Sequence, residues 1–299
     1  MEPLIQIGPA APRLPSWLRK GQTHFESLTR LKGQLRQLRL HTVCESARCP
    51  NIHECFHRGA ATFMILGNRC TRGCSFCSVP KFNPRRQTSP LDAEEPENVA
   101  RMAAQMNLRY VVITSVNRDD LADGGAAHVA ATITAVRAAL PSARIEVLTP
   151  DFQGDLQAVA QVLDAGPDVF NHNMETVARL YRQVRPQANY EQSLRVLQFA
   201  KAHRPETLTK SGLMVGLGET AGEVRTLLRD LRAADVDVAT IGQYLQPARG
   251  NRPVSRYVPP AEFDAWRDYG LSLGFQNVFA GPFVRSSYMA DLVHQQTQA

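Results

Sequence analysis

The stretch "ATFMILGNRCTRGCSFCSV", residues 61–79, joins an apolar run to three closely spaced cysteines. The run 61–66 has the length and composition of a buried β-strand. Cys70, Cys74 and Cys77 follow it, separated by three and two residues. In α/β folds with parallel strands, functional residues gather beyond the carboxyl ends of the strands. The order of this stretch therefore predicts a cluster of thiols at one mouth of such a sheet.

Five further apolar runs suit buried parallel strands, and amphipathic stretches of helical period separate them. These runs are 109–114, 144–149, 168–172, 209–215 and 237–242. Alternation of strand and helix patterns predicts parallel pairing through crossover helices. The predicted fold class is α/β, with six units forming a partial (β/α)6 barrel of the TIM type. An open doubly wound sheet has the same pattern and stays an alternative.

Composition sets broad limits on function. The chain has 299 residues, of which 43% are hydrophobic and 21% charged, as in ordinary globular proteins. A net charge of +6 without a dense basic run predicts no nucleic-acid partner. No apolar stretch approaches the ~20 residues of a membrane span, and the N-terminus has no signal-peptide pattern. We therefore expect a cytoplasmic protein with no membrane partner, in which cysteines serve metal binding or catalysis rather than disulfides.

The trio that ends at Cys77 suits an iron–sulfur cluster better than zinc. Structural zinc takes four ligands, and no fourth Cys or His follows this trio within twenty residues. A [4Fe–4S] cubane has four corners, so that three thiolates leave one iron open. An open iron can chelate the amino and carboxylate groups of a small molecule. Zinc remains the alternative at this stage.

A second trio, Cys44, Cys49 and Cys55, occurs in "CESARCPNIHEC" with gaps of four and five residues. This set is also one ligand short. On ordinary metal chemistry His53 or His57 could complete it, although each is more often a packed or solvated side chain. Spacing alone leaves the fourth ligand open.

The two trios together resemble the lipoyl synthase family, whose members are radical S-adenosylmethionine enzymes that insert sulfur. Other radical enzymes share only the trio that ends at Cys77. The resemblance spans roughly residues 15–292 and continues in order through "TSVNRDDLADGGA", "NHNMETV", "KSGLMVGLGET", "GQYLQP", "RPVSRYVPP" and "GPFVRSSY".

The resemblance implies two [4Fe–4S] clusters and S-adenosylmethionine as cofactors. One cluster, whose open iron binds S-adenosylmethionine, would be held by Cys70, Cys74 and Cys77. An auxiliary cluster, whose ligands count as catalytic, would be held by Cys44, Cys49, Cys55 and Ser287. Ser287 belongs to the "RSSY" motif, and a serine oxygen is a harder ligand than a thiolate. A weakly held corner suits a cluster that must later be dismantled.

Five other residues are predicted to contact S-adenosylmethionine. Ser115 and Asn117 would contact its methionine end, and Asn171 and Glu175 its ribose hydroxyls. Arg185 would pair with its carboxylate through a guanidinium fork. As alternatives, Glu175 caps a helix start and Arg185 is a solvated residue at a helix end.

The resemblance also implies an activity and partners. The activity is the insertion of two sulfur atoms, at C6 and C8 of a protein-bound octanoyl chain, with the auxiliary cluster as sulfur donor. The expected partners are octanoylated lipoyl-carrier domains (of 2-oxoacid dehydrogenase E2 or glycine-cleavage H protein), an electron donor such as flavodoxin or ferredoxin, and iron–sulfur assembly or carrier proteins. Competing readings are a different radical enzyme that inserts sulfur or transfers methylthio groups, and a zinc-stabilised interaction protein.

Three segments are expected along the chain. Residues 1–58 form an N-terminal extension with the auxiliary cysteines, 59–275 form the partial barrel, and 276–299 form a C-terminal segment with "RSSY". Both extensions are expected to cover the barrel mouth.

Overall fold

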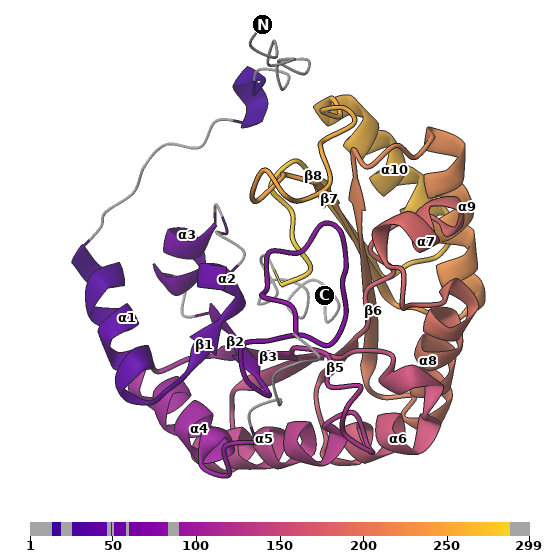
Figure 1. Ribbon diagram of the computed structural model, residues 1–299. Coiled ribbons are helices and arrows are strands. Elements are labelled where there is room, and N and C mark those ends of the chain that lie inside the picture. The colour runs from indigo at the N-terminus through magenta and orange to yellow at the C-terminus, as the bar shows by residue number, and fades with distance from the viewer. Residues whose placement is uncertain are drawn as a thin grey trace, which may run out of the picture.

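The computed structural model describes residues 14–18, 26–46, 49, 51–57, 60–82 and 90–287. Within them, one eight-stranded sheet curves into an incomplete ring (Figure 1), and its strands lie in sequence order. The strands are β1 His41–Thr42, β2 Ala60–Ile65, β3 Tyr110–Ser115, β4 Arg144–Leu148, β5 Val169–Asn171, β6 Leu208–Val215, β7 Val238–Gln243 and β8 Asn277–Gly281. All neighbours pair in parallel except β1, which is antiparallel to β2.

The predicted partial barrel is confirmed, and all six predicted strands are present as β2 to β7. A doubly wound sheet would reverse its strand order at a switch point, and this sheet has no reversal. Two strands were not predicted. β1 has only two residues, and most of β8 is partly exposed, so neither has the buried apolar run on which the strand predictions were based.

Helices cover the outer face of the sheet (Figure 1). Within the described residues the α-helices are α1 Glu26–Gln37, α2 Val43–Ser46, α3 Ile52–His57, α4 Glu95–Gln105, α5 Ala126–Ala139, α6 Leu156–Asp164, α7 Tyr181–Val184, α8 Tyr190–His203, α9 Ala221–Ala233 and α10 Pro260–Ser272. Short 3₁₀ turns occupy Ser16–Leu18, Phe152–Gly154 and Ala178–Leu180.

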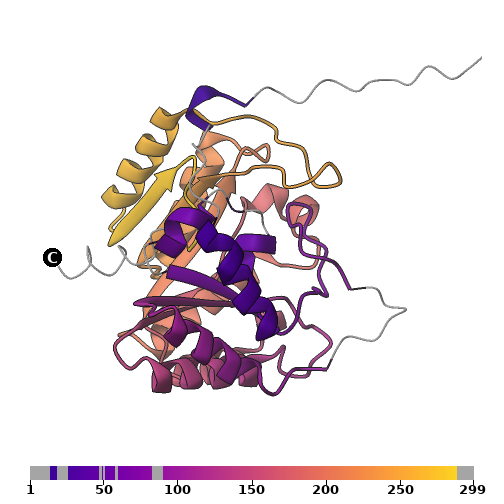
Figure 2. The ribbon, with the colours of Figure 1, turned by 90° about the vertical axis from the view of Figure 1, so that its left-hand side faces the viewer.

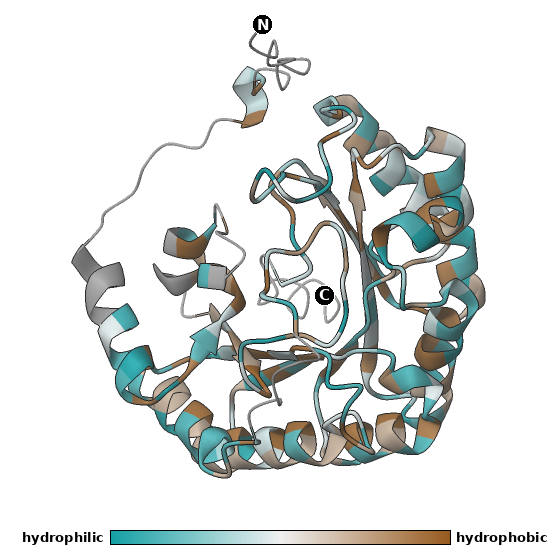
Figure 3. Ribbon diagram, in the orientation of Figure 1, coloured by the Kyte–Doolittle hydropathy of each residue, from teal (hydrophilic) through white to brown (hydrophobic). Residues whose placement is uncertain are grey.

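Helix α9 shows why these segments pack as they do. Thr220 accepts a hydrogen bond from the backbone of Glu223, whose carboxylate accepts one in return, so that a capping box starts the helix. Val224, Leu227, Leu228 and Leu231 then recur at helical spacing and are buried. Figure 3 shows apolar positions, in brown, along the strands and on the surrounding helices.

A fully buried ion pair lies between the strands. Lys210 Nζ of β6 lies 3.0 Å from Glu146 Oε2 of β4, and neither side chain is exposed. The Tyr110 hydroxyl and the Asn171 amide both donate hydrogen bonds to the Glu146 carboxylate at 2.8 Å. A buried charge pair persists only where further hydrogen bonds satisfy it, and this network supplies them.

The open side of the ring lies between β1 and β8, where segments distant in sequence meet. Figure 2 faces the side of α1 and shows β8 running beside α10. Asn51 Nδ2 donates to the Phe283 carbonyl at 2.7 Å, which ties the segment of the early cysteines to the segment after β8. Among the described helices, none is both long and apolar enough to cross a bilayer.

Candidate active site

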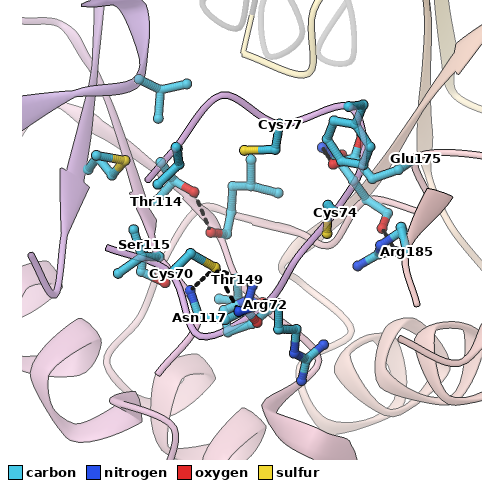
Figure 4. A pocket seen from close by; sticks show the side chains of 18 of the residues that line it. Cys70, Arg72, Cys74, Cys77, Thr114, Ser115, Asn117, Thr149, Glu175 and Arg185 are labelled. Carbon is cyan, nitrogen blue, oxygen red and sulfur yellow. Dashed lines mark hydrogen bonds between the residues drawn. The ribbon is translucent and has the colours of Figure 1, made fainter. Parts of the chain in front are cut away.

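The later trio lies on the loop that follows β2. Leu66 and Gly67 both have positive φ, 67° and 94°, and turn the chain at the end of the strand. Cys70, Cys74 and Cys77 then line a cavity of about 200 Å³ together with residues from the loops after β3, β4 and β5 (Figure 4). The thiols therefore lie at the mouth of the barrel, as the sequence predicted.

A buried arginine anchors this loop. Arg72 donates from Nε and Nη2 to the Asp119 carboxylate at 2.8 and 2.9 Å, and from Nη2 to Asp151 at 2.6 Å. Burial alone would raise the pKa of Asp151, but the hydrogen bonds and charge of Arg72 lower it to about 2. Thr71 adds a hydrogen bond to the Asn117 carbonyl at 3.0 Å. The cysteine loop is thus fastened to the loops after β3 and β4.

Two of the three sulfurs, those of Cys74 and Cys77, lie in surroundings that disfavour thiolates unless a cation is present. Burial raises the pKa of Cys77 to about 11 and also raises the pKa of Cys74. Cys70 Sγ accepts hydrogen bonds from the backbone N–H groups of Arg72 and Asn117 at 3.4 and 3.3 Å (Figure 4). Metal coordination deprotonates thiols outright, so the site suits thiols that become thiolates on binding iron.

Four of the five predicted S-adenosylmethionine contacts line this cavity. They are Ser115, Asn117, Glu175 and Arg185. The fifth, Asn171, is not among the lining residues, and its amide donates to Glu146 at 2.8 Å instead. Asn173, two residues further along the chain, lines the cavity in its place. Strand alternation puts residues two apart on the same face, so the sequence pattern alone does not distinguish Asn173 from Asn171.

Glu175 and Arg185 are held in unusual positions. Glu175 has a φ of 64° and forms an isolated parallel bridge with Leu213. Burial raises the pKa of Glu175, opposed by the charge of Arg185 and by a hydrogen bond from Asn173. Arg185 is only 9% exposed and donates to the Asn173 carbonyl at 2.8 Å and to the Tyr181 hydroxyl at 2.9 Å. Glu175 therefore does not cap a helix, and Arg185 is not solvated.

The polar lining fits a ligand with amino, carboxylate and hydroxyl groups. Several of its buried atoms have no hydrogen-bond partner among the described residues. They are Ser115 Oγ, Asn117 Oδ1, Thr149 Oγ1, Asn173 Oδ1 and Arg185 Nε. Buried polar atoms are rarely left unpaired in folded proteins. These donors and acceptors match the groups that S-adenosylmethionine carries.

The early trio lines a second, smaller cavity. Cys44 lies on α2, Cys55 on α3 and Cys49 between them, and Ser287 lines the same cavity from the segment after β8. Burial, and next the charge of Cys49, raise the pKa of Cys44 to about 12. Thr62 Oγ1 of β2 donates to Ser287 Oγ at 3.1 Å. The structure thus brings together the four residues predicted to hold the auxiliary cluster.

A glycine permits this approach of the C-terminal segment. A Cβ built on Gly242 of β7 would overlap the carbonyl oxygen of Val284. No side chain therefore fits there, and the segment that carries Ser287 packs directly on the backbone of β7.

Both cysteine sites open onto one larger cavity of about 390 Å³. Its lining includes Cys44, Cys49 and Ser287 from one site, and Cys77 and Glu175 from the other. Apolar side chains make up much of the wall between them, namely Val43, Phe76, Val79, Leu148, Leu213, Met214 and Val284. The two sites can therefore act on one apolar ligand.

The arrangement of the thiols suits clusters better than a single zinc ion. All six cysteines lie outside disulfides. In the described part of the chain, no three Cys, His, Asp or Glu side chains converge on a position for one metal ion. Each trio instead lines a cavity wall, as expected where every thiolate binds a different iron. The side chains of His53 and His57, the alternative ligands, lie outside the described part.

Comparison with known proteins agrees with the fold and the cysteine loop. The family model of the radical SAM superfamily matches residues 64–231. A solved structure of Streptococcus suis SuiB bound to S-adenosylmethionine has a TM-score of 0.55 at 12% identity, covering 86% of this chain and 61% of that one. Methylornithine synthase (PylB) has a TM-score of 0.51 at 17% identity, covering 91% and 84%. The fold and site define a radical SAM enzyme, a class that uses S-adenosylmethionine with a [4Fe–4S] cluster.

Proteins with sequences more similar to this chain identify its family within the radical SAM class. A model of the N-terminal domain of lipoyl synthase of the radical SAM family matches residues 5–49. Lipoyl synthase of Thermus thermophilus is 54% identical over 93% of this chain and 86% of its own length. Lipoyl synthase of Aromatoleum aromaticum is 54% identical over 96% of this chain and 91% of its own length. The chain belongs to the lipoyl synthase family and is an enzyme of the radical SAM sulfurtransferase type.

Proposed function

We propose that this enzyme inserts sulfur at C6 and C8 of an octanoyl chain carried on a lysine of a lipoyl-carrier domain, and that an auxiliary [4Fe–4S] cluster donates the sulfur. One observation supports this most directly. The two cysteine trios open onto a single cavity with a largely apolar wall, which suits an acyl chain placed between a radical source and a sulfur source.

The first site would hold the radical source. Cys70, Cys74 and Cys77 would bind a [4Fe–4S] cluster, and the unpaired polar atoms beside them would bind S-adenosylmethionine. Together these groups supply a carbon radical that removes hydrogen from unactivated C–H bonds, which no acid or base side chain can ionise.

The protein orients the cofactor at this site. Arg185 would pair with the carboxylate through its free Nε edge, while Ser115 and Asn117 would contact the same methionine end. Glu175 would accept from the ribose, and the second ribose contact fits Asn173 better than Asn171 because Asn173 lines the cavity.

The shared cavity would orient the acyl chain and exclude water. Leu148, Leu213 and Met214 contribute apolar surface between the two sites. These three side chains offer water no hydrogen-bond partner, so this part of the wall would help to protect a substrate radical from side reactions.

The second site would hold the sulfur source, which is a substrate. Cys44, Cys49 and Cys55 would bind three irons, and the Ser287 oxygen the fourth. Because oxygen binds iron less well than thiolate in such clusters, Ser287 would be the weakest of the four ligands.

The chemistry requires partners that the chain itself does not contain. A carrier domain (2-oxoacid dehydrogenase E2 or glycine-cleavage H protein) would present the octanoyl-lysine, and flavodoxin or ferredoxin would supply electrons. Iron–sulfur assembly or carrier proteins would replace the consumed cluster. We propose the cytoplasm as the compartment.

Anaerobic reconstitution tests the proposal. Enzyme with S-adenosylmethionine, dithionite and an octanoylated carrier should yield lipoyl carrier, detected by mass spectrometry. Single replacement of Cys44, Cys49 or Cys55 by Ala should preserve cleavage of S-adenosylmethionine and abolish sulfur transfer. Cys74→Ala should abolish both, because it removes a ligand of the radical source. Lipoyl product from a variant of the early trio would overturn the sulfur-donor role.

The same assay separates the competing functions. A methylthiolated or differently thiolated product would indicate another radical enzyme. Colourless protein that contains zinc and no acid-labile sulfide would indicate a zinc-stabilised interaction protein.

A further inference from the structure

Arg285 is a cation at the boundary between the second cysteine site and the shared cavity. It lies on the segment after β8, two residues before Ser287, and lines both cavities. Its guanidinium donates to the Val284 carbonyl at 2.7 Å and reaches the Pro282 carbonyl at 3.5 Å. Both partners belong to its own segment, so these bonds leave its charge uncompensated.

Two other enclosed arginines have carboxylate partners, whereas the buried Arg185 donates to the Asn173 carbonyl and the Tyr181 hydroxyl. Arg72 pairs with Asp119 and Asp151, and Arg118 pairs with Asp120 at 2.8 Å. The ion pairs within the described residues do not include Arg285. An enclosed cation is costly unless an opposite charge lies nearby. Arg285 instead lines the cavity of the early trio, together with Cys44, Cys49 and Cys55.

Since no described carboxylate balances Arg285, we look for its counter-charge in the group that the trio would hold. A cation alone and thiolates alone are both unfavourable in this enclosed space. Three thiolates and a serine oxygen around an iron–sulfur core carry net negative charge, which a guanidinium at this boundary would offset.

We propose that Arg285 is the counter-charge of the second cysteine site and sets the reduction potential of the cluster held there. The inference rests on the proposed function. When a carbon radical bonds to a cluster sulfide, one C–S bond forms, one electron passes to the irons, and no proton moves. A fixed cation beside the cluster favours the state with the extra electron, so Arg285 is a positioning residue for sulfur transfer.

A variant that lacks the first cluster allows the second to be measured alone. The parent protein carries Cys70→Ala, Cys74→Ala and Cys77→Ala. Arg285→Met removes the charge at similar length, and Arg285→Lys keeps it. Arg229→Met removes an exposed arginine from α9 as a control. Iron and sulfide are assayed for each, and the midpoint potential is determined by a redox titration followed by electron paramagnetic resonance.

We expect Arg285→Met to give a more negative potential than the parent at equal iron and sulfide content. Arg285→Lys and Arg229→Met should stay at the potential of the parent. An intact cluster at the parent potential in Arg285→Met would overturn the proposal. If Arg285→Met binds no cluster, Arg285→Gln replaces it in the titration, and the parent potential there would overturn the proposal equally.

Failure of the underlying function would have a different signature. A parent protein without iron and sulfide would count against the auxiliary cluster itself, before any substitution of Arg285 is compared. An unchanged potential in an iron-loaded Arg285→Met would count against Arg285 alone.

Discussion

The Thr62 hydroxyl donates a hydrogen bond to the Ser287 hydroxyl at 3.1 Å, across a sequence separation of 225 residues. The contact joins the third residue of β2 to the segment beyond β8. Ser287 also lines the cavity of the early trio, and the accepted bond uses one of its two lone pairs and leaves the other for a metal.

Replacement of Ser287 should separate cluster retention from sulfur release. Ser287→Cys should keep the second cluster, since thiolate binds iron well, and should slow lipoyl formation because that corner no longer opens readily. Ser287→Ala should instead lose iron from the second site. Iron analysis and mass spectrometry of the carrier measure the two effects. Thr62→Val, which removes only the supporting hydroxyl, should lower the affinity of the second site for iron by about tenfold to a hundredfold. Wild-type turnover in Ser287→Cys would refute the role of the weak corner.

The close packing of Val284 on Gly242 predicts a second effect. Gly242→Ala should push the C-terminal segment away from β7, because the added Cβ would overlap the Val284 carbonyl. The variant should lose iron from the second site while iron at the first site remains. Gly250→Ala is the matched control, since nothing lies within 4 Å of a Cβ there. Equal iron content in both variants would contradict the prediction.

The contribution of Arg72, which anchors the first cysteine loop, should be measurable as a change in the free energy of unfolding. Arg72→Met leaves the fully buried Asp151 without its cation, and loss of one partner of a buried pair costs about 3–5 kcal/mol. The free energy of unfolding of the apoprotein in urea measures this. Arg267→Met breaks an exposed pair with Asp264 and should cost about 1 kcal/mol or less. A similar loss in the two variants would show that the loop is not anchored by Arg72.

Acid should destabilise the protein through His172. Its ring Nδ1 donates to the Thr149 carbonyl at 2.9 Å, and Nε2 accepts from Ser193 at 3.0 Å, so the neutral ring fits. Burial, and then the charge of Arg185, lower the pKa of His172 from 6.5 to about 4. The unfolded chain binds the extra proton first, and stability therefore falls as the pH decreases from 6.5 toward 4.

The size of this loss of stability follows from the difference between the pKa of His172 in the unfolded and folded chain. Over that interval the contribution of His172 is about 3 kcal/mol. His172→Gln should flatten the pH dependence of the unfolding free energy, whereas His203→Gln, at a partly exposed position, should leave it unchanged. An identical slope in wild type and His172→Gln would refute the assignment.

The sequence predicted elements with strong local signals and missed those that depend on distant partners. Six strands were found because each is a continuous apolar run. Arg72 and Asp151 are 79 residues apart, and no local pattern connects them. Asn173 was missed as a lining residue because alternation places Asn171 and Asn173 on the same face and does not tell which of them reaches the cavity. Ser287 and the site it completes came from the resemblance alone, since a serine near a C-terminus has no metal signature of its own. The three-segment division along the chain stays a prediction.

The order in which the chain leaves the ribosome has a consequence for the second site. Cys44, Cys49 and Cys55 are synthesised early, whereas Ser287 follows the final strand. A nascent chain can therefore display three thiols long before the oxygen ligand exists. A cluster with all four ligands can therefore form only after residue 287 has been synthesised. A chain truncated before that residue would bind iron through three thiols and would lack the fourth ligand.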